Sequence, residues 1–445
     1  MAEQMKPSGI DWIGDIPKSW KVKPIAYMTK SRSGGTPDRN NLLYWENGTI
    51  PWMSSGEVNK VNIYDTDEKI TTLAVHHSSA KIISKNAVMV ALNGQGKTKG
   101  MSAILRIDSA CNQSLCAFSC NAGILYYEYL FWCFQTMYTY LRQMSGDDVR
   151  DGLAASYVKK QKIPVPKYEE QQAIADFLDK ECAQVDSIAA DLEKQIELLQ
   201  QYKKSLITET VTKGLDKTVP MKDSGVEWLG KIPAHWNFKR LKFMLENSSD
   251  SMKVGPFGSA LSGSDFTDEG KWVYNQRVVL DNNFSENTTF VSEEKFQEMR
   301  SFAVCPGDIL ITTRGTIGKV AIVPEGANEG ILHPCIIKFR VDKEMIIPEL
   351  LQLIFNESDF VKDQFTLMSN ATTIEVIYSY SLKDILLPVI PADEQKKIYG
   401  YLSKKCLAID GIIAEKQKSL ATITQHKKSL IYEYVTGKKR VKEVR

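Results

Sequence analysis

Two short segments combine glycines with side chains that could bind an anion or read a nucleic-acid base. Residues 93–97 read Asn-Gly-Gln-Gly-Lys and residues 314–319 read Arg-Gly-Thr-Ile-Gly-Lys, each after an apolar run. Glycine lets the backbone approach a bound group closely, and Arg, Lys, Asn and Gln carry the donors that contact phosphates and base edges. The sequence therefore predicts two loops suited to an anionic partner.

The first loop resembles the end of a phosphate-binding P-loop, but the rest of that motif is missing. The motif requires a glycine where Ala91 stands and a helix afterwards, and this chain continues Lys-Gly-Met-Ser over residues 99–102. The zinc-protease, nucleophile-elbow and dinucleotide-binding motifs do not occur, nor does the Asn/Asp-Pro-Pro-aromatic tetrapeptide of amino methyltransferases. We therefore expect a chain without catalytic residues and without a cofactor of its own.

The eight cysteines are too sparse in 445 residues for a disulfide scaffold. Cys111, Cys116 and Cys120 come closest to a cluster, but no second Cys or His pair follows, so we interpret them as buried thiols and expect no metal site. The first residues lack the apolar stretch of a signal peptide, and no segment approaches the ~18 apolar residues of a membrane span. We expect a protein of a reducing cytoplasm.

The charge balance restricts where nucleic acid could bind. The chain has 56 Lys and Arg against 54 Asp and Glu, a formal net charge of +2. Such a balance excludes a uniformly basic coat, so any DNA surface must be a local patch.

The chain contains an internal repeat. Residues 8–20 recur as residues 224–236 with seven identities, among them two tryptophans, and the pair Glu170-Gln171 returns as Glu394-Gln395. The segments between them, 21–163 and 237–387, match poorly. Two similar sets of flanking segments thus enclose two different central segments, which we call the bodies.

The repeated segment after each body has the pattern of a long helix. Residues 167–213 contain no Pro or Gly, and apolar residues recur every seven positions, with Ile174, Ile188 and Tyr202 in a companion row. The second copy is interrupted by Lys416 and weakened by two glycines. The predicted seam consists of Leu178, Val185, Leu192, Leu199 and Leu206 in the first helix and Leu402, Ile409, Ile423 and Leu430 in the second.

The seam would be exposed to water if either helix stood alone. We therefore expect the two copies to pack against each other, antiparallel about a pseudo-twofold axis, so that each helix ends near the opposite arm and the chain termini lie close together. The alternative is two separate helices, each lying on its own body.

Each body has the pattern of mixed strands and helices. Strands are predicted at 85–92, 103–105, 306–313 and 320–323, and amphipathic helices at 126–142 and 348–360. The predicted fold class is α+β, with two mixed α/β bodies separated by a pair of long antiparallel coiled-coil helices. The predicted domains are an arm with the first body (1–163), a first spacer helix (164–219), a second arm with the second body (220–387) and a second spacer helix (388–445).

This order of segments resembles the specificity subunit (HsdS) of type I restriction-modification systems. The resemblance rests on the Ser-Gly-x-x-Trp-x-Gly-x-Ile-Pro-x-x-Trp arms, on the body openings at 33–37 and 255–259, on Gly-Asp-Ile-Leu at 307–310 and on the two Glu-Gln pairs. It covers essentially the whole chain.

The resemblance implies a subunit that recognises DNA sequence and has no catalytic activity of its own. Each body would be a target recognition domain for one half of a bipartite asymmetric site in double-stranded DNA. The helix pair would set the spacing and dock two methyltransferase (modification) subunits, and motor-nuclease (restriction) subunits would join the complex. S-adenosylmethionine and ATP would bind to those partner subunits.

Candidate base or phosphate contacts follow from the residue types that read DNA. They are Arg32, Asn93, Gln95, Lys97, Lys99, Asn112 and Gln113 in the first body and Lys253, Asn275, Gln276, Arg277, Arg314 and Lys319 in the second. For each residue the alternative is a solvated loop position or a turn-forming role. Two other functions stay open from the residues alone: a coiled-coil scaffold presenting two non-DNA binding modules, and an enzyme with methyltransferase activity.

Overall fold

The computed structural model describes residues 4–94, 96–144, 152–258, 260–369 and 376–441. The chain forms two compact units, a first unit of Met1–Leu192 with Lys418–Arg445 and a second unit of Glu193–Gln417. Each unit combines one arm, one body and adjoining parts of two long helices. The predicted α+β class is confirmed, whereas the four predicted domain boundaries divide the chain along its sequence and stay a prediction.

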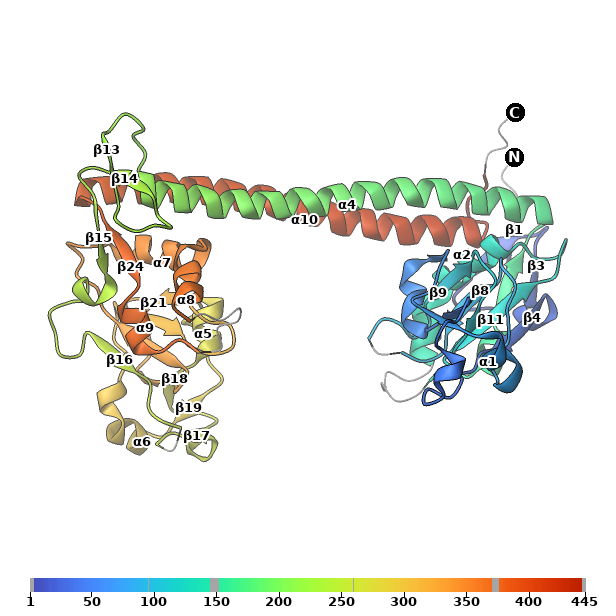
Figure 1. Ribbon diagram of the computed structural model, residues 1–445, viewed down its shortest axis with the longest axis horizontal. Helices are drawn as coiled ribbons and strands as arrows, with labels where there is room; N and C mark the ends of the chain where they lie inside the picture. Colours follow the sequence, from blue (N-terminus) through green and yellow to red (C-terminus); the bar gives the residue numbers. More distant parts are fainter. Residues whose placement is uncertain (1–3, 95, 145–151, 259, 370–375, 442–445) are drawn as a thin grey trace. The chain divides into compact units, whose positions relative to one another are not determined.

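The two long helices are α4 (Tyr168–Lys213, 46 residues) and α10 (Ala392–Val435, 44 residues) (Figure 1). α10 continues without a break through Gly400 and Gly411. A glycine inside a helix costs about 1 kcal/mol relative to alanine. Tertiary packing against α4 outweighs that cost, as it commonly does for long amphipathic helices.

The helices are antiparallel in both units. In the first unit the rings of Phe177 and Tyr434 lie 4.4 Å apart and Lys427 Nζ lies 2.6 Å from Asp186 Oδ1. As the residue number rises along α4, the number of its partner on α10 falls. The alternative of separate helices is therefore wrong for this unit.

The second unit repeats this arrangement with the roles of the helices exchanged. Lys203 Nζ lies 2.8 Å from Asp410 Oδ2, and these two residues are the repeat equivalents of Lys427 and Asp186. Lys416, which interrupts the predicted seam, extends across the helix pair and donates to Gln195 Oε1 at 2.5 Å. The same Lys–Asp contact thus forms once in each unit, with the lysine on α4 in one unit and on α10 in the other.

The predicted seam residues are buried or half-buried at every position. The first unit contains Leu178, Val185, Leu192, Ile423 and Leu430, and the second contains Leu199, Leu206, Leu402 and Ile409.

The companion row was predicted only in part. Ile174 is buried, but Ile188 and Tyr202 are 50% and 55% exposed. Ile188 and Tyr202 therefore lie outside the contact face of the helix pair, whereas the row of Leu178 stays within it.

Each arm is a small hairpin whose second tryptophan is buried. The strands are β1 (Met5–Pro7) with β2 (Asp15–Pro17) and β13 (Met221–Asp223) with β14 (Lys231–Pro233). Trp20 Nε1 donates to Glu170 Oε2 at 3.2 Å, and Trp236 Nε1 donates to Glu394 Oε2 at 2.9 Å. The glutamate of each Glu-Gln pair therefore joins an arm to the start of a long helix.

Each long helix ends at the arm of the opposite repeat. Gly437, with φ +74°, follows α10, and a Cβ there would lie 2.5 Å from Pro17 Cδ of the first arm. Gly214, with φ +75°, follows α4 and lies against Trp236 of the second arm. The predicted pseudo-twofold exchange of helix ends is confirmed, while the terminal residues 1–3 and 442–445 lie outside the described residues.

The body of the first unit contains three sheets. The five-stranded sheet has the order β4 (Thr29–Ser33), β11 (Leu115–Cys120), β8 (Val88–Ala91), β9 (Ser102–Leu105) and β6 (Asn62–Ile63). The others are β10 (Ala110–Cys111) with β5 (Ile50–Met53) and β7 (Glu68–Ile70), and β12 (Lys162–Val165) with β3 (Lys21–Pro24). Its helices are α1 (Thr72–His77), α2 (Tyr127–Met144) and α3 (Ala155–Lys160), with 3-10 turns at Ile25–Tyr27, Leu42–Tyr44 and Ser55–Lys60.

The body of the second unit follows the same plan. One sheet has the order β16 (Met252–Val254), β23 (Ile336–Phe339), β20 (Ile309–Thr312) and β21 (Val320–Ile322). A second has the order β17 (Phe266–Thr267), β19 (Phe290–Val291), β18 (Lys271–Tyr274) and β22 (Gly330–Leu332), and β15 (Asn237–Arg240) pairs with β24 (Leu386–Val389). Its helices are α5 (Gln276–Asp281), α6 (Glu293–Glu298), α7 (Pro348–Glu357), α8 (Phe360–Ser369) and α9 (Ser379–Lys383), with 3-10 turns at Leu241–Phe243, Gly263–Asp265 and Arg300–Phe302.

The strand and helix predictions hold with one exception. The segment 348–360 was predicted as one helix, but α7 ends before Ser358, which has extended backbone angles and separates α7 from α8.

Among the described residues, no helix combines the length and apolar character needed to cross a membrane.

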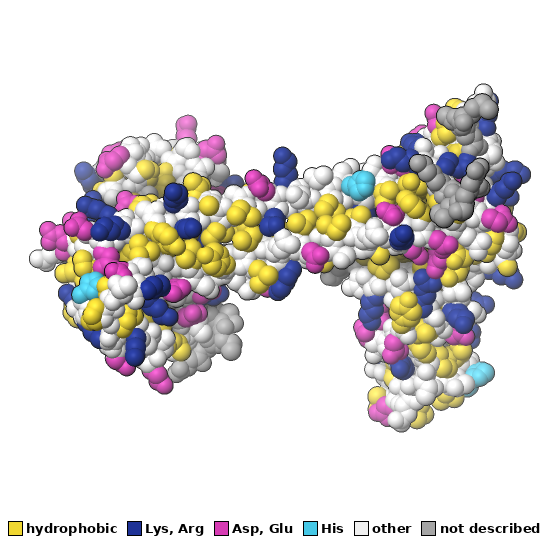
Figure 2. All heavy atoms as spheres, turned by 90° about the horizontal axis from the view of Figure 1, so that it is seen from above, with side chains coloured by type: hydrophobic (Ala, Val, Ile, Leu, Met, Phe, Trp, Pro, Cys, Tyr) yellow, Lys and Arg dark blue, Asp and Glu magenta, His cyan; other side chains and the backbone are white. Residues whose placement is uncertain are grey.

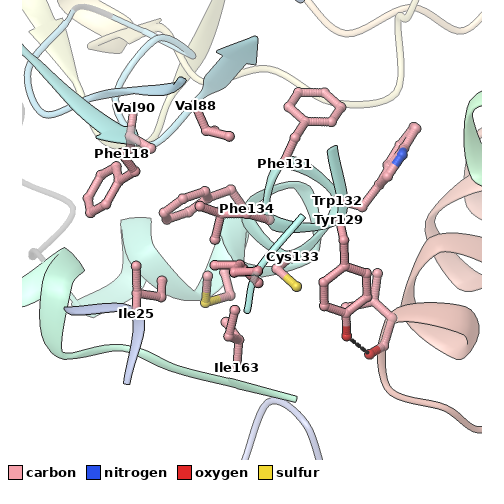
Figure 3. Packing of buried hydrophobic residues seen from close by; sticks show 14 of the residues in the cluster. Ile25, Val88, Val90, Phe118, Tyr129, Phe131, Trp132, Cys133, Phe134 and Ile163 are labelled. Atoms are coloured by element: carbon pink, nitrogen blue, oxygen red, sulfur yellow. Dashed lines mark hydrogen bonds between the residues drawn. The ribbon is translucent and has the colours of Figure 1, made fainter. Parts of the chain in front are cut away.

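α2 joins the first body to the helix pair. Its residues Tyr129, Cys133 and Phe134 are fully buried in the core of the first unit (Figure 3). The hydroxyl of Tyr129 donates to the carbonyl oxygens of Pro164 and Val435, both at 3.1 Å. The end of α10 is thereby tied to the body by packing and by hydrogen bonds.

The glutamine of each Glu-Gln pair connects a long helix to its body. Gln171 is fully buried, accepts from the backbone N–H of Tyr126 at 2.8 Å and donates to the carbonyls of Ile124 and Pro166. Gln395 makes the equivalent three bonds to Ile347, Met345 and Ile390.

Replacing Gln171 by alanine should therefore destabilise the first unit. Three buried backbone groups would lose their partners, and we expect a loss of about 2–4 kcal/mol, which lowers Tm by roughly 5–10 °C in thermal unfolding followed by circular dichroism. Gln201→Ala, at an exposed position of α4, is the control and should leave Tm within about 1 °C. Equal effects of the two substitutions would contradict this role of Gln171.

Candidate nucleic-acid interface

Five segments of the first body meet at one end of its sheets. Gly34 N–H donates to Leu115 O at 3.4 Å, Asn112 N–H to Met53 O at 3.0 Å, Leu92 N–H to Ser114 O at 2.8 Å and Leu153 N–H to Leu92 O at 2.8 Å. These bonds bring together the ends of β4, β5 and β8 and the start of β11. We call the residues 34–37, 54–56, 92–94, 96–100, 112–114 and 153–156 the first loop edge.

The second body has the same edge. The matching bonds run from Gly255 to Ile336 O at 2.8 Å, from His333 to Tyr274 O at 3.2 Å, from Thr313 to Cys335 O at 3.1 Å and from Ile377 to Thr313 O at 2.9 Å. We call the residues 255–258, 275–277, 313–319, 333–335 and 376–380 the second loop edge. All the matched positions are 221 residues apart, except that Ile377 follows Leu153 by 224.

The two loop edges share a backbone but differ in their side chains. At equivalent positions the first edge has Thr36 and Asn93 where the second has Phe257 and Arg314. On the strand that leads into the edge, Arg32 of β4 is equivalent to Lys253 of β16. The sequences of the bodies do not reveal this alignment, because hydrogen bonds between backbones do not depend on the side chains they carry.

In the first loop edge, side chains of α2 form hydrogen bonds to the backbone of the glycine-rich loop. The hydroxyl of Tyr138 donates to Lys97 O at 2.7 Å, and Arg142 Nη1 donates to the carbonyls of Gly96 at 2.9 Å and Lys99 at 3.2 Å. The Lys97 side chain is exposed, whereas that of Lys99 is only 7% exposed. After the loop the chain enters strand β9 rather than a helix, so the structure agrees with the rejection of a P-loop.

The other candidates of the first body lie at or beside the same edge. Arg32, Asn93 and Gln113 are exposed, and Gln113 Oε1 accepts from Thr36 Oγ1 at 2.5 Å. Asn112 is half-buried and its side chain accepts from Ser114 N–H at 3.1 Å, which is a turn-forming role. Gln95 lies outside the described residues.

In the second edge, Asn275 has a structural role. Its Oδ1 accepts from the N–H groups of Arg277 and Val278 at the start of α5, and its Nδ2 donates to Thr289 Oγ1 at 3.0 Å. Ser54, the equivalent residue of the first edge, likewise caps a short helix. This is a normal N-cap arrangement, so the amide of Asn275 is already engaged within the body.

The remaining candidates of the second body differ in exposure. Arg314 and Arg277 are exposed, and Arg277 Nε lies 3.4 Å from Asp281 Oδ2. Gln276 Nε2 donates to Thr316 O at 3.3 Å, and Lys253 Nζ lies 5.2 Å from the ring centroid of Phe302.

Lys319 is directed into the body. Its Nζ donates to the carbonyl of Asn356 at the end of α7, and burial lowers its pKa. Of the two cations in the glycine-rich loop 314–319, Arg314 therefore presents its charge to solvent and Lys319 does not.

Two residues of the second edge were not singled out from the sequence. Tyr378 and Tyr380 are 53% and 67% exposed, and their rings stack at 5.4 Å with an interplanar angle of 8°. They occupy the positions of Ala154 and Ser156 in the first repeat, at the 224-residue offset. In the sequence, this feature is indicated only by the exchange of small residues in the first repeat for aromatic ones in the second.

The three clustered cysteines, Cys111, Cys116 and Cys120, are buried or half-buried. Cys111 and Cys116 are buried, and within the described residues no group of three or more His, Cys, Asp and Glu side chains could hold a metal ion. Burial raises the pKa of Cys111 and of Cys120 to about 12.

Comparison with known proteins gives a consistent result. The profile of the type I restriction modification DNA specificity domain matches residues 17–198 and 253–422. The chain is 31% identical over 192 residues to the EcoR124I/EcoR124II specificity subunit of Escherichia coli, covering 41% of this chain and 45% of that protein. It is 24% identical over 439 residues to the MjaVIII specificity subunit of Methanocaldococcus jannaschii, covering 96% of this chain and 95% of that protein.

A solved structure shows the same fold. One chain from a study of complex assembly and conformational transition of the type I R-M system superposes with a TM-score of 0.72 at 15% identity. The match covers 94% of this chain and 98% of that chain.

The thiol pKa values predict a pattern of alkylation. Because only the thiolate reacts, Cys111 and Cys120 of the native protein should react with iodoacetamide at pH 8 at least about a hundredfold more slowly than the exposed Cys305. Peptide mapping by mass spectrometry measures the three rates, and the unfolded protein is the control in which they should become similar. Rapid labelling of native Cys111 would contradict the buried-thiol interpretation.

Proposed function

Because this chain belongs to the family of type I restriction-modification specificity subunits, we propose that its two bodies each read one half of a bipartite, asymmetric DNA site. The observation that carries the proposal is the pair of loop edges. Their backbone hydrogen bonds coincide, while the exposed side chains differ at position after position, such as Asn93 against Arg314. A common support with different polar groups suits two readers of different base sequences.

We further propose that α4 and α10 set the spacing of the two half-sites. Half-sites read from one side of a duplex are separated by about one helical turn, ~34 Å. A pair of packed helices holds a distance that a flexible linker would leave variable. The reciprocal ion pairs of Lys203 with Asp410 and of Lys427 with Asp186 stabilise the register on which that distance depends.

The outer surface of the helices supports the docking of two copies of one partner. Ile188 and Ile412 are repeat equivalents, and they are 50% and 45% exposed. Figure 2, which looks onto the helix pair, shows hydrophobic side chains in yellow along the helices. We propose that the modification subunits bind there, that motor-nuclease subunits complete the restriction complex, and that S-adenosylmethionine and ATP bind to those partners.

Exchange of one body should change one half-site. If residues 21–163 are replaced by the corresponding body of another specificity subunit, methylation mapping should show a new first half-site and an unchanged second half-site. Gel shifts with the modification subunits and duplexes carrying each combination of half-sites provide the control. Failure of the unaltered complex to bind any duplex would contradict DNA reading and favour a scaffold for other ligands.

Lengthening the helices should change only the number of base pairs between the two half-sites. Four residues inserted after Leu192 and four after Gln417 add about 6 Å, close to one full turn, and so keep the faces of the helices aligned. We expect methylation mapping to show both half-sites unchanged and a gap longer by about two base pairs. A change in the half-site sequences would contradict the role of the helices as a spacer.

A further inference from the structure

The second loop edge contains an exposed aromatic pair beside an exposed cation. Ile377 N–H donates to Thr313 O at 2.9 Å, and Val376 forms an antiparallel bridge with Arg314. The stacked rings of Tyr378 and Tyr380 follow directly in the chain. The backbone of Arg314 thus lies beside the segment that leads into Tyr378 and Tyr380.

This cluster is specific to the second body. The equivalent residues of the first edge are Ala154, Ser156 and Asn93, which carry neither an aromatic ring nor a charge. The difference occurs although the bond from Ile377 to Thr313 has its counterpart from Leu153 to Leu92. The cluster therefore adds a binding feature to one reader rather than supporting the common backbone.

A carboxylate further along the segment of Tyr378 and Tyr380 is already compensated by two cations. The carboxylate that follows α9, Asp384, is paired with Arg240 at 3.2 Å and with Lys242 at 3.0 Å. Gly315 and Gly318, with φ of +66° and +77°, allow the loop after Arg314 to turn tightly and to approach a bound group.

The stacking geometry selects the kind of contact. A side chain that unstacks base pairs inserts as a wedge between them, with its faces against the bases. In Tyr378 and Tyr380 one face of each ring is partly covered by the other ring, and the two residues are 53% and 67% exposed. Tyr hydroxyls and Arg are common donors to the DNA backbone.

We propose that Tyr378, Tyr380 and Arg314 bind the sugar-phosphate backbone at the second half-site, with both hydroxyls donating to phosphate oxygens and the guanidinium pairing with a phosphate. This inference rests on the proposed DNA-reading function. It assigns to the second body a backbone clamp that the first body lacks.

The test uses isosteric variants in the complete complex with the modification subunits. Fluorescence anisotropy measures binding to a duplex with the methylation-mapped site and to duplexes with base changes in either half-site. Y378F and Y380F keep the rings and remove one hydroxyl each, and each should weaken binding about tenfold. The loss should be similar for all bases tested in the second half-site, because phosphate contacts are independent of sequence.

The salt dependence separates the cation from the hydroxyls. R314Q should weaken binding and lower the slope of log K against log salt by about one, whereas the tyrosine variants should leave the slope unchanged. Y64F removes the hydroxyl of a tyrosine that is 71% exposed and lies outside both loop edges, so it is the matched control and should bind like the unaltered protein.

The outcomes separate this inference from the function on which it rests. Specific binding by the unaltered complex together with unchanged binding by Y378F and Y380F would overturn the backbone clamp alone. A changed base preference in those variants would also overturn it in favour of base readout. Absence of specific binding by the unaltered complex would overturn the proposed function itself.

Discussion

The antiparallel packing of α4 on α10 is the interaction on which the rest of the structure depends. Each long helix begins under its own body, where a buried glutamine holds the body and a glutamate holds an arm tryptophan, and ends against the arm of the other repeat. Neither helix could keep its apolar seam from water without the other. The repeat in the sequence thus lets the same Lys–Asp contact form once in each unit, with the roles of the two helices exchanged.

That frame leaves the two bodies free to differ. The four backbone hydrogen bonds that assemble each loop edge do not require particular side chains, so positions such as Thr36 and Phe257 can change without loss of the fold. Phe257 is 88% exposed and Thr36 is half-buried, so neither belongs to the core. Under the proposed function, specificity can vary at such positions while stability remains in the helices, the arms and the glutamine contacts.

The sequence predicted the features that follow from periodicity and repetition. The long helices, the arms and the main strands of each body are local patterns, and their positions agree with the structure. The roles of single polar residues were harder to predict. Asn275 and Lys319 belong to the residue types that contact DNA, and only their tertiary partners show that they form hydrogen bonds within the body. Tyr378 and Tyr380 were missed because their exposure depends on how segments far apart in sequence meet.

The central claim is that two different readers are held in register by one helix pair. Methylation mapping of the host genome with and without this gene tests it most directly. The account predicts a gene-dependent adenine methylation motif with two unrelated specific blocks separated by an unspecified gap of constant length. A single continuous motif, or two identical inverted blocks, would contradict it.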